Sequence, residues 1–584
     1  MGRLDELKAA KTRSDLAKLL HFTPKGLAYV LYKTPAADKY SIFTIPKKGG
    51  GERRIEAPEP RLKLLQTQLA AVLYDCLEEI ESETPNRRSI SHGYHRGRSI
   101  VTNAVPHRRH RYVLNIDLSD FFGTINFGRV RGFFIKDSNF ALTDEAATTI
   151  AQIACHEGRL PQGSPCSPVI SNLIARILDV RLARLAKSTG CTYTRYVDDL
   201  TFSTAQRTFP PKLAKKIATS PHKWRLMRSL RDEIKNAGFK INTAKTRMQI
   251  CGSRQEATGL VINEKINISQ PAYRTIRSMT HTLFSTGKYF VPGGELDPSG
   301  APKWISELAP LEGRLAHLYF VKARRDRSEQ LNKRENFKTP RAVKELYRRF
   351  LFYKYCVAPE APLIVTEGKT DVMYLKSALK ARGALHPQLA SEEKGKSKRQ
   401  IRFLPASYMN NTVLELGSSA SQLTKLIESY SNRLKLYRHR PLSAPVIVIA
   451  DNDDGVDRIL KAANKRSELE VKAGTPQCMF HIVDNLYLVK TPHVGEKAKT
   501  CIEDLFSDRL KSQKVKGKPF DIKKDHGDET SYGKSRFAEE VVAKLAQAPD
   551  FAGFEPLLNA IEGAISDYSS RMMNKERSAA LIGT

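Results

Sequence analysis

Apolar and polar positions follow several distinct patterns over the first 350 residues. Residues 40–60 alternate apolar and polar side chains around a Lys-Lys-Gly-Gly-Gly turn, which predicts a β-hairpin. Residues 113–118 form a short apolar run with an acid near its end, which predicts a buried strand that delivers a carboxylate. The segment 192–203 predicts two strands around a turn. Helical spacing of apolar residues is found at 4–31, 62–80, 167–186 and 225–237.

The pattern changes near residue 358, beyond which apolar runs and helical segments alternate. Pro359 and Pro362 interrupt the chain, and a short apolar run follows at 363–365. A second apolar run at 444–450 comes after a polar, basic loop at 391–400. Strands that alternate with helices are typical of a parallel α/β domain. The sequence therefore predicts a multidomain protein of the α/β and α+β classes with a boundary near residue 358.

Length and charge narrow the class of protein. The chain has 584 residues, which at roughly 100–200 residues per domain predicts three to five domains or subdomains. Its 96 Lys and Arg against 62 Asp and Glu give a net charge of +34, which favours a polyanionic partner, nucleic acid ahead of a membrane. No apolar run approaches the ~20 residues of a membrane-spanning helix. None of the eight cysteines forms a CxxC pair, so we expect reduced thiols in a cytoplasmic protein, with homo-oligomerisation left open.

Three acids stand at ends or turns of the predicted strands. Asp117 closes one strand, and Asp198 and Asp199 occupy the turn between two others. Carboxylates placed in this way can converge on one edge of a sheet and hold two Mg²⁺ ions roughly 3.5–4 Å apart. Such ions activate an attacking 3′-hydroxyl and stabilise the leaving pyrophosphate. Because an Asp-Asp pair alone also fits a helix cap or a solvated turn, the neighbouring motifs decide between these interpretations.

From about residue 40 to residue 350 the chain resembles reverse transcriptases, and five motifs around these acids occur in the same order as in that family. They are NIDLSDFF at 115–122, LPQGSPCSP at 160–168, YVDD at 196–199, GFKINTAKT at 238–246 and ATGLVIN at 257–263. The resemblance implies a right-hand polymerase with fingers, palm and helical thumb. It also implies dNTP substrates and a two-metal Mg²⁺ site.

The resemblance implies roles for single residues as well. Asp117, Asp198 and Asp199 would be the metal ligands, and the backbone carbonyl of Leu118 would add a contact. Phe122 would be the steric gate against a ribose 2′-hydroxyl; its alternative is a plain core aromatic. Forked guanidinium donors suit phosphate groups, which fits the hairpin cations. The nucleotide contacts implied are Gln162 and Gly163 in the pocket, Lys47 and Arg53 on the triphosphate, with Arg54 as the alternative to Arg53, and Lys245 beside the pyrophosphate.

The segment between the hairpin and the first catalytic motif indicates a subfamily. Residues 87–111 hold seven arginines and no acid, which favours contact with phosphates over a solvated face. Within this segment, NAVPH at 103–107 fits the NAxxH motif of bacterial retron reverse transcriptases, whereas residues 257–259 are ATG where retrons usually have VTG.

A retron enzyme binds a cognate structured non-coding RNA and primes from the 2′-hydroxyl of an internal guanosine. Its product is a branched RNA–DNA hybrid, multicopy single-stranded DNA. A basic helical thumb would grip the RNA stems by shape and phosphate. The nucleic-acid contacts that the resemblance implies are Asn103, His107, Thr258, Gly259, Arg324 and Arg325.

A second acidic pattern lies beyond residue 358. Glu367-Gly368 follows one apolar run and Asp451-x-Asp453 follows the next, at the strand ends where open α/β sheets bind ligands. This order resembles the TOPRIM domain of topoisomerases, primases and OLD-type nucleases, which implies that Glu367, Asp451 and Asp453 bind Mg²⁺ or Mn²⁺. The chain has no zinc-binding primase module, which favours a nuclease. The further site candidates are Asp371, Asp454, Glu503 and Lys534, the last two by resemblance to OLD-type nucleases.

Together these resemblances imply an N-terminal helical cap (1–35), fingers and palm (36–265), a thumb (266–357) and an α/β TOPRIM effector domain with a parallel sheet (358–584). A retron polymerase fused to such a domain resembles retron systems of anti-phage defence, in which we expect the RNA–DNA product to restrain the nuclease. Two alternatives stay open. The C-terminal domain could bind nucleic acid without cutting it, or the enzyme could be a maturase- or diversity-generating-type reverse transcriptase.

Overall fold

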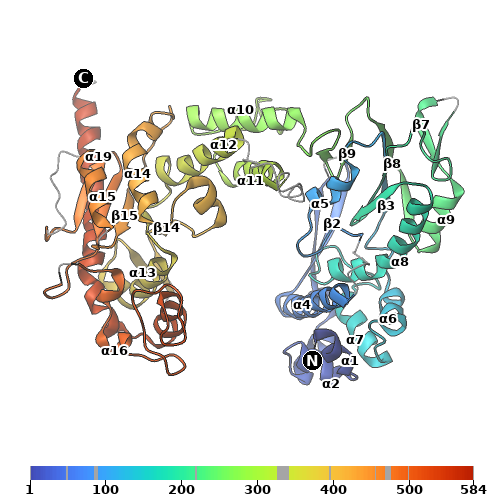
Figure 1. Ribbon diagram of the computed structural model, residues 1–584, viewed down its shortest axis with the longest axis horizontal. Coiled ribbons are helices and arrows are strands. Elements are labelled where there is room, and N and C mark those ends of the chain that lie inside the picture. Colours follow the sequence, from blue (N-terminus) through green and yellow to red (C-terminus); the bar gives the residue numbers. More distant parts are fainter. Residues whose placement is uncertain are drawn as a thin grey trace. The chain divides into compact units, whose positions relative to one another are not determined.

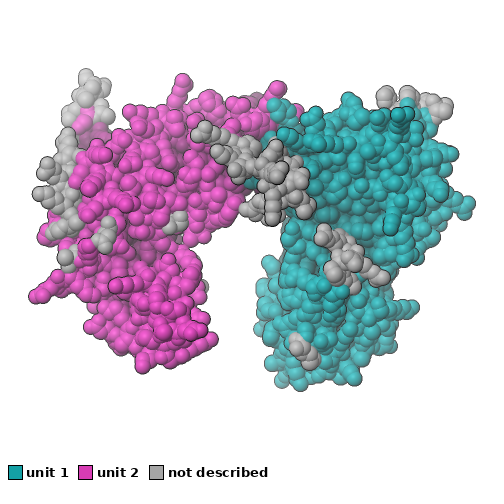
Figure 2. All heavy atoms as spheres, in the orientation of Figure 1, with its two compact units in different colours: residues 1–270, 321–337 teal, residues 271–320, 338–584 magenta. Residues whose placement is uncertain are grey.

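The computed structural model describes residues 2–582 apart from 48–49, 84–89, 218–219, 325–340, 394–395, 418, 454, 467–474 and 498. The chain forms two compact units, one of residues 1–270 with 321–337 and the other of residues 271–320 with 338–584 (Figure 2). Most of the segment predicted as thumb therefore packs with the C-terminal part of the chain. One reason is helix α12 (Arg341–Phe352), whose Lys344 and Arg348 bind Glu415 at 2.8 and 2.7 Å.

The first unit is built on a four-stranded antiparallel sheet with the order β4-β5-β3-β8 (Figure 1). These strands are β3 (Tyr112–Ser119), β4 (Thr192–Tyr196), β5 (Asp199–Thr204) and β8 (Lys240–Ile250). The apolar run of the sequence is the buried centre of β3. Helix α8 (Ser167–Ser188) packs against β4 and buries its apolar side in the core of the unit.

The predicted cap and hairpin are both present in this unit. The hairpin pairs β1 (Tyr40–Pro46) with β2 (Glu52–Pro58), and the core-facing helix that follows is α4 (Pro60–Glu83). The helix expected at 225–237 is shorter, since β7 extends to residue 226. The remaining elements are α1 (Arg3–Ala9), α2 (Arg13–Leu19), α3 (Pro24–Ala28), α5 (Ile100–Ala104), α6 (Phe127–Lys136), α7 (Asp144–Ala154), β6 (Ala214–Ile217), β7 (Ser220–Leu226), α9 (Arg228–Asn236), β9 (Glu256–Ala257) and β10 (Leu260–Val261).

The second unit is built on a five-stranded sheet with the order β14-β11-β15-β17-β16. The strands are β11 (Leu363–Val365), β14 (Arg402–Phe403), β15 (Val446–Ala450), β16 (Met479–Val483) and β17 (Leu486–Lys490). The two predicted strands, β11 and β15, are adjacent and parallel, and only β16 runs antiparallel to its neighbour. The parallel α/β sheet predicted for this part of the chain is therefore confirmed.

Helices pack against this sheet. Side chains of α13 and α19 contribute to the apolar core on which β11, β15 and β17 lie. Among the described residues, no helix has an apolar stretch long enough to span a lipid bilayer. The helices and the remaining hairpin are α10 (Gln270–Thr286), α11 (Ala309–Arg324), α13 (Lys369–Arg382), α14 (Ala420–Leu434), α15 (Val456–Asn464), α16 (Asp508–Lys511), α17 (Lys534–Arg536), α18 (Ala543–Leu545), α19 (Glu555–Ile582) and β12 (Ala390–Glu393) with β13 (Lys396–Arg399).

A buried ion pair joins α8 to the sheet of the first unit. Arg195, on β4, is fully buried and donates from Nε and Nη2 to the two carboxylate oxygens of Asp179, each at 2.8 Å. Its Nη1 donates to Asn172 and to the backbone carbonyl of Val197, at 3.2 and 3.0 Å. A guanidinium with this many partners is satisfied without water. The pair therefore fixes the turn that follows β4.

We expect Arg195→Met to destabilise the first unit by about 3–5 kcal/mol, because it leaves the Asp179 carboxylate buried and unpaired. The urea concentration at the midpoint of unfolding of that unit, monitored by limited proteolysis, measures the effect. Arg228→Met is the matched control, since Arg228 is exposed and binds Asp232 only across one turn of α9. Equal midpoints for the two variants would contradict the prediction.

Candidate active sites

The turn between β4 and β5 brings three carboxylates together. Tyr196 and Asp199 are paired in register, so that Val197 and Asp198 form a tight turn in which Val197 has a φ of 60°. Asp199 lies opposite Asp117 in the β3–β5 register. The backbone N–H of Leu118 donates to the carbonyl of Asp198 at 2.9 Å. Antiparallel pairing alone therefore places Asp117 beside the two acids of the turn.

These carboxylates are held close to one another against their mutual repulsion. Burial raises the pKa of Asp199 to about 6, and the charges of Asp198 and Asp117 add to the rise. Burial also raises the pKa of Asp198. The carboxylate of Asp117 is stabilised by two neighbours on β8: Asn242 Nδ2 donates to its Oδ1 at 2.9 Å, and Lys245 Nζ donates to its Oδ2 at 3.1 Å. A nearby cation would favour the charged form of all three carboxylates.

The donor set fits the Mg²⁺ that the sequence predicts. Nowhere in the described residues do three or more His, Cys, Asp or Glu side chains form a group arranged to hold a metal ion. Mg²⁺ does not need one, because it commonly binds through one or two carboxylates and completes its octahedron with water and substrate phosphates. Burial and the neighbouring acids raise the pKa values of Asp198 and Asp199, and a bound cation would stabilise the charged forms of both.

A cavity of about 870 Å³ opens in front of these acids. Every residue predicted for the metal or nucleotide site of the polymerase lines it: Lys47, Arg53, Asp117, Leu118, Phe122, Gln162, Gly163, Asp198, Asp199 and Lys245. The ring of Phe122 is half-buried, with its centroid 6.3 Å from that of Tyr94. Tyr94 and Arg159 also line the cavity, although sequence reasoning assigned neither of them a role.

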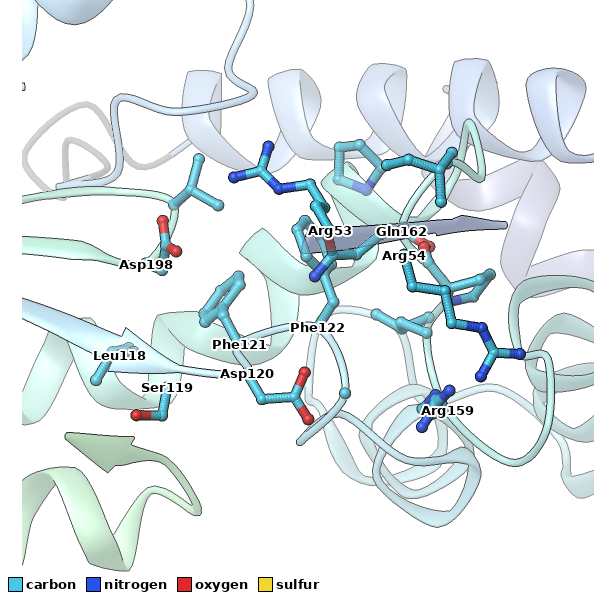
Figure 3. A pocket seen from close by; sticks show the side chains of 18 of the residues that line it. Arg53, Arg54, Leu118, Ser119, Asp120, Phe121, Phe122, Arg159, Gln162 and Asp198 are labelled. Atoms are coloured by element: carbon cyan, nitrogen blue, oxygen red, sulfur yellow. The ribbon is translucent and has the colours of Figure 1, made fainter. Parts of the chain in front are cut away.

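The structure distinguishes the two hairpin arginines. Arg54 binds Glu56 at 3.2 Å and Glu157 at 3.4 Å, and in Figure 3 it lies with Arg159 on the side of the cavity away from Asp198. Arg53 faces the acids closely enough to lower the pKa of Asp198, which burial raises. Among the described residues, no carboxylate forms an ion pair with Arg53. Of the two, Arg53 is therefore the cation with its fork available for a phosphate.

Gly163 occupies a position that only glycine suits. Its φ is 130°, and an added Cβ would lie 2.6 Å from the backbone carbonyl oxygen of Glu56 on β2. The N–H of Glu56 in turn donates to the carbonyl of Gln162 at 2.7 Å. A side chain at this glycine would push the hairpin away from the cavity wall. The predicted pocket residues Gln162 and Gly163 thus join the hairpin to the rest of the unit.

The predicted nucleic-acid contacts need correction at two residues. Asn103 and His107 are fully buried, so direct contact with nucleic acid is wrong for both. The two ring nitrogens of His107 lie 2.6 Å from Ser203 Oγ and 2.8 Å from Thr194 Oγ1, and burial lowers its pKa to about 3. The imidazole is therefore neutral and ties the segment after α5 to β4 and β5. A motif alone does not show which way its side chains point.

The other predicted nucleic-acid contacts differ in what the structure shows of them. Thr258 and Gly259 form the turn between β9 and β10, with Gly259 exposed and Thr258 Oγ1 donating to the carbonyl of Ile100 at 3.3 Å. Arg325 and the side chain of Arg324 lie outside the described residues.

A second set of acids gathers at the sheet of the other unit. Glu367 follows β11 and Asp451 follows β15, and the two parallel strands bring them to the same edge. Burial raises the pKa of Glu367, with Asp453 adding to the rise, and burial raises that of Asp451 well above its ordinary value, with Asp371 and Glu503 adding. The structure therefore brings together the acids predicted here.

Lys534 and Glu503 belong to the same cluster. Glu503 is fully buried, and Lys534 Nζ lies 3.2 Å from its carboxylate. Burial alone would lower the pKa of Lys534, but the charges of Glu503 and Asp451 outweigh burial and raise it. This lysine is therefore charged and reaches the acids from α17, far along the chain from β11. Carboxylates are ligands that suit a divalent ion, although no group of three or more potential ligands in the described residues is arranged to hold one.

Two further acids were secondary candidates in the sequence. Asp371 accepts a hydrogen bond from the N–H of Gly368 at 2.9 Å and so caps α13, as its sequence position suggests. Burial also raises its pKa to about 7, with Glu503 adding to the rise, which shows that the cap belongs to the acidic cluster. Asp453 is exposed and accepts from the N–H of Gly455 at 2.8 Å. Asp454 lies outside the described residues.

Known proteins are similar to this chain, and the family model that matches it lies within the first unit. The family model for reverse transcriptase (RNA-dependent DNA polymerase) matches residues 45–262. The retron Mx65 reverse transcriptase of Myxococcus xanthus is 35% identical over 291 residues, which cover 46% of this chain and 62% of that protein. The retron Ec86 reverse transcriptase of Escherichia coli is 33% identical over 273 residues, covering 46% and 77%.

A solved structure of apo telomerase from Candida tropicalis is similar over 54% of this chain and 60% of its own, with 13% identity; its TM-score of 0.30 is too low to support a common fold. The chain spans about six tenths of the length of the Myxococcus relative. The family match ends before the second unit begins. On the identity to the Ec86 protein over most of that protein's length, the chain belongs to the retron reverse transcriptase family.

Proposed function

We propose that the chain is an RNA-directed DNA polymerase that copies a cognate structured non-coding RNA into branched multicopy single-stranded DNA, primed from a guanosine 2′-hydroxyl. The observation that carries the proposal is one cavity lined both by Asp117, Asp198 and Asp199 and by the hairpin cations Lys47 and Arg53. A cavity lined by clustered acids and by cations suits a nucleoside triphosphate and its metal ions. Membership of the retron family supports the branched product.

Each wall of the cavity has its own part in this reaction. When bound by Asp117, Asp198 and Asp199, Mg²⁺ would activate the attacking hydroxyl and neutralise charge on the phosphates. Arg53 and Lys47 would bind the triphosphate, since a free guanidinium fork matches phosphate oxygens. Phe122 would meet the sugar of the incoming nucleotide, where a half-buried ring leaves little room for a 2′-hydroxyl.

Lys245 is placed to hold a proton beside the leaving group. Its Nζ lies 3.1 Å from Asp117 Oδ2 and its side chain is largely exposed to the cavity. With Asp117 engaged as a metal ligand, the Lys245 ammonium would be free to turn to the pyrophosphate and hold a proton there. The wall formed by Gln162 and Gly163 would position the base and sugar for the attack.

The remaining sequence suits a long nucleic-acid partner. The net charge of +34 supplies non-specific attraction for a structured RNA and its RNA–DNA product. The exposed turn at Thr258 and Gly259 would contact the primer strand. The basic segment 314–349 would hold the stems of the RNA by their phosphates rather than by base readout.

Replacement of Asp198 and Asp199 by Asn should abolish DNA synthesis while leaving the RNA bound. The measurement is a denaturing gel of nucleic acid that co-purifies with the protein expressed beside its own locus, after RNase and debranching treatments. A discrete DNA band that debranching shortens, absent in the variant, is expected. Asp232→Asn on α9 is the control. Unbranched cDNA from the wild type would instead support the maturase- or diversity-generating-type alternative.

DNA synthesis should require more Mg²⁺ as the pH falls through about 6. The pKa of Asp199 is raised to about 6, so below that pH a proton competes with the metal ion for the same carboxylate. The Mg²⁺ concentration for half-maximal synthesis should rise about tenfold per pH unit below this value and little above pH 7. A Mg²⁺ requirement that stays constant between pH 5 and pH 8 would contradict the assignment of Asp199 as a ligand.

We further propose that the second unit contains a TOPRIM-like, metal-dependent nuclease that acts as an effector in anti-phage defence. Glu367 and Asp451 at the ends of adjacent parallel strands, with Lys534 and Glu503 beside them, support it. Mg²⁺ or Mn²⁺ held by these carboxylates would activate water, and the charged Lys534 would stabilise the phosphate. A domain that only binds nucleic acid gains nothing from several clustered acids, since they repel phosphates and one another.

The bound RNA–DNA product would restrain this nuclease until a phage disturbs the product. The freed enzyme would then cut host or phage nucleic acid and halt growth. Equal nuclease activity with and without the bound hybrid would contradict the restraint, while leaving the nuclease proposal standing.

Lys534→Ala should reduce cleavage of plasmid DNA or total RNA by at least about 100-fold, because loss of one positioned catalytic group typically costs 10²–10⁴. Glu367→Gln should do the same, and EDTA should abolish cleavage in the wild type. The matched control is Lys544→Ala, an exposed lysine on α18. If all three variants lack activity that the wild type shows, the loss is not specific to the acidic cluster.

A further inference from the structure

A separate cavity of about 340 Å³ lies at the outer edge of the sheet in the second unit. It is bounded by β14, the last strand of the sheet, and by Lys376 of α13 (Figure 1 labels both elements). Leu363 at the start of β11 lines it, whereas Glu367 follows the end of the same strand. The cavity is therefore distinct from the acidic cluster, and it shares no lining residue with the polymerase cavity.

The described residues that line this cavity are strongly basic. Among the described residues, four cations line it, Lys354, Lys376, Arg399 and Arg402, against one carboxylate, that of Glu360. Glu360 is already bound to Arg402, and Lys354 is bound to Glu312 at 2.7 Å. Within the part of the chain that the structure describes, no acid forms an ion pair with Lys376 or Arg399. Two cations are therefore left to attract an anion into the cavity.

Two aromatic rings line the same space. Tyr355 and Phe403 are both half-buried, and each has a lysine near its face: Lys354 Nζ is 5.1 Å from the Tyr355 centroid and Lys376 Nζ 5.6 Å from the Phe403 centroid. Partly exposed rings beside cations are how proteins hold nucleotides, because the ring stacks on a base while the cation meets the phosphate. An anion without a base, such as free phosphate, would leave both rings unused.

We propose that this cavity binds a nucleotide, with the base against Phe403 or Tyr355 and the phosphate between Lys376 and Arg399. A volume of about 340 Å³ is at the small end of ligand cavities, which suits one nucleotide rather than a folded nucleic acid. The same chemistry fits a free mononucleotide or one nucleotide of a strand. Among the described residues that line the wall, the one carboxylate, Glu360, is already paired with Arg402, so we expect binding without a metal ion and hence in EDTA.

The test is photo-crosslinking of 8-azidoadenosine 5′-monophosphate to the full-length protein in EDTA, after co-purifying nucleic acid has been removed at high salt. Labelled peptides are mapped by mass spectrometry. We expect the label on the peptides that contain Tyr355 or Phe403. EDTA suppresses metal-dependent nucleotide binding at the polymerase site, and no catalytic activity is read, so the result does not depend on either proposed function.

Variants make the assignment specific. Lys376→Glu and Arg399→Glu should each raise the half-saturating concentration of the probe about tenfold or more, equivalent to about 1.4 kcal/mol. Phe403→Leu keeps an apolar side chain against the core but removes the stacking surface, and should weaken labelling as well. Arg458→Glu on α15 makes the same charge change at an exposed arginine outside the cavity and should leave labelling unchanged.

Competition identifies the source of the nucleotide. Stronger competition by AMP than by a short oligodeoxyadenylate, at equal nucleotide concentration, indicates a free mononucleotide, and the reverse indicates a strand. Label confined to peptides outside the cavity would overturn the proposal. So would equal half-saturating concentrations for Lys376→Glu, Arg399→Glu and Arg458→Glu.

Discussion

The buried ion pair of Arg195 with Asp179 is the interaction on which the geometry of the first unit depends. Two adjacent aspartates at a tight turn, beside a third across a strand pair, repel one another. A turn held only by its two flanking strands could relieve this repulsion by bending away. Arg195 prevents this, because its guanidinium donates a hydrogen bond to the carbonyl of Val197 while its other nitrogens bind the carboxylate of Asp179 on α8.

The two acidic clusters bring carboxylates together at the edges of two different kinds of sheet. In the first unit an antiparallel turn places two acids next to each other, and a neighbouring strand adds the third. In the second unit, parallel strands each end in an acid at the same edge, and residues from distant parts of the chain close the site. In both clusters a lysine contacts a carboxylate, Lys245 on Asp117 and Lys534 on Glu503. Each lysine offsets part of the negative charge before any metal ion binds.

Most of the site could be predicted because its chemistry is local in sequence. The order of strand, turn and acid fixes which residues meet at a sheet edge, and β3, β11 and β15 formed where the apolar runs indicated. What failed was direction: a motif containing Asn103 and His107 does not reveal that both side chains point inward. Pairing across long separations was also invisible. The sequence signal for Arg195 was a lone charge in a strand otherwise suited to burial, and only the contact with Asp179 explains it.

The extent of the second unit shows a related limit. Basic, helical segments before residue 358 have the composition of a thumb, yet contacts such as those of Lys344 and Arg348 with Glu415 join them to the C-terminal part of the chain. Composition reports what a surface can attract, and it does not report which neighbour a helix packs on. Compact units follow buried contacts, so their limits need not coincide with motif boundaries.

The close approach of Gly163 to β2 has a consequence for how this enzyme can diverge. Alternate residues of a strand face opposite ways, so one residue inserted between Arg54 and Glu56 would exchange the sides on which the two hairpin arginines lie. Arg54 would then turn toward the acids, and Arg53 would take the place beside Glu157. The contact between Gly163 and the carbonyl of Glu56 would fix the far end of the strand during that change. Relatives of this protein should therefore tolerate length changes at the hairpin tip, in the Gly-rich turn, and very few between the arginines and Glu56.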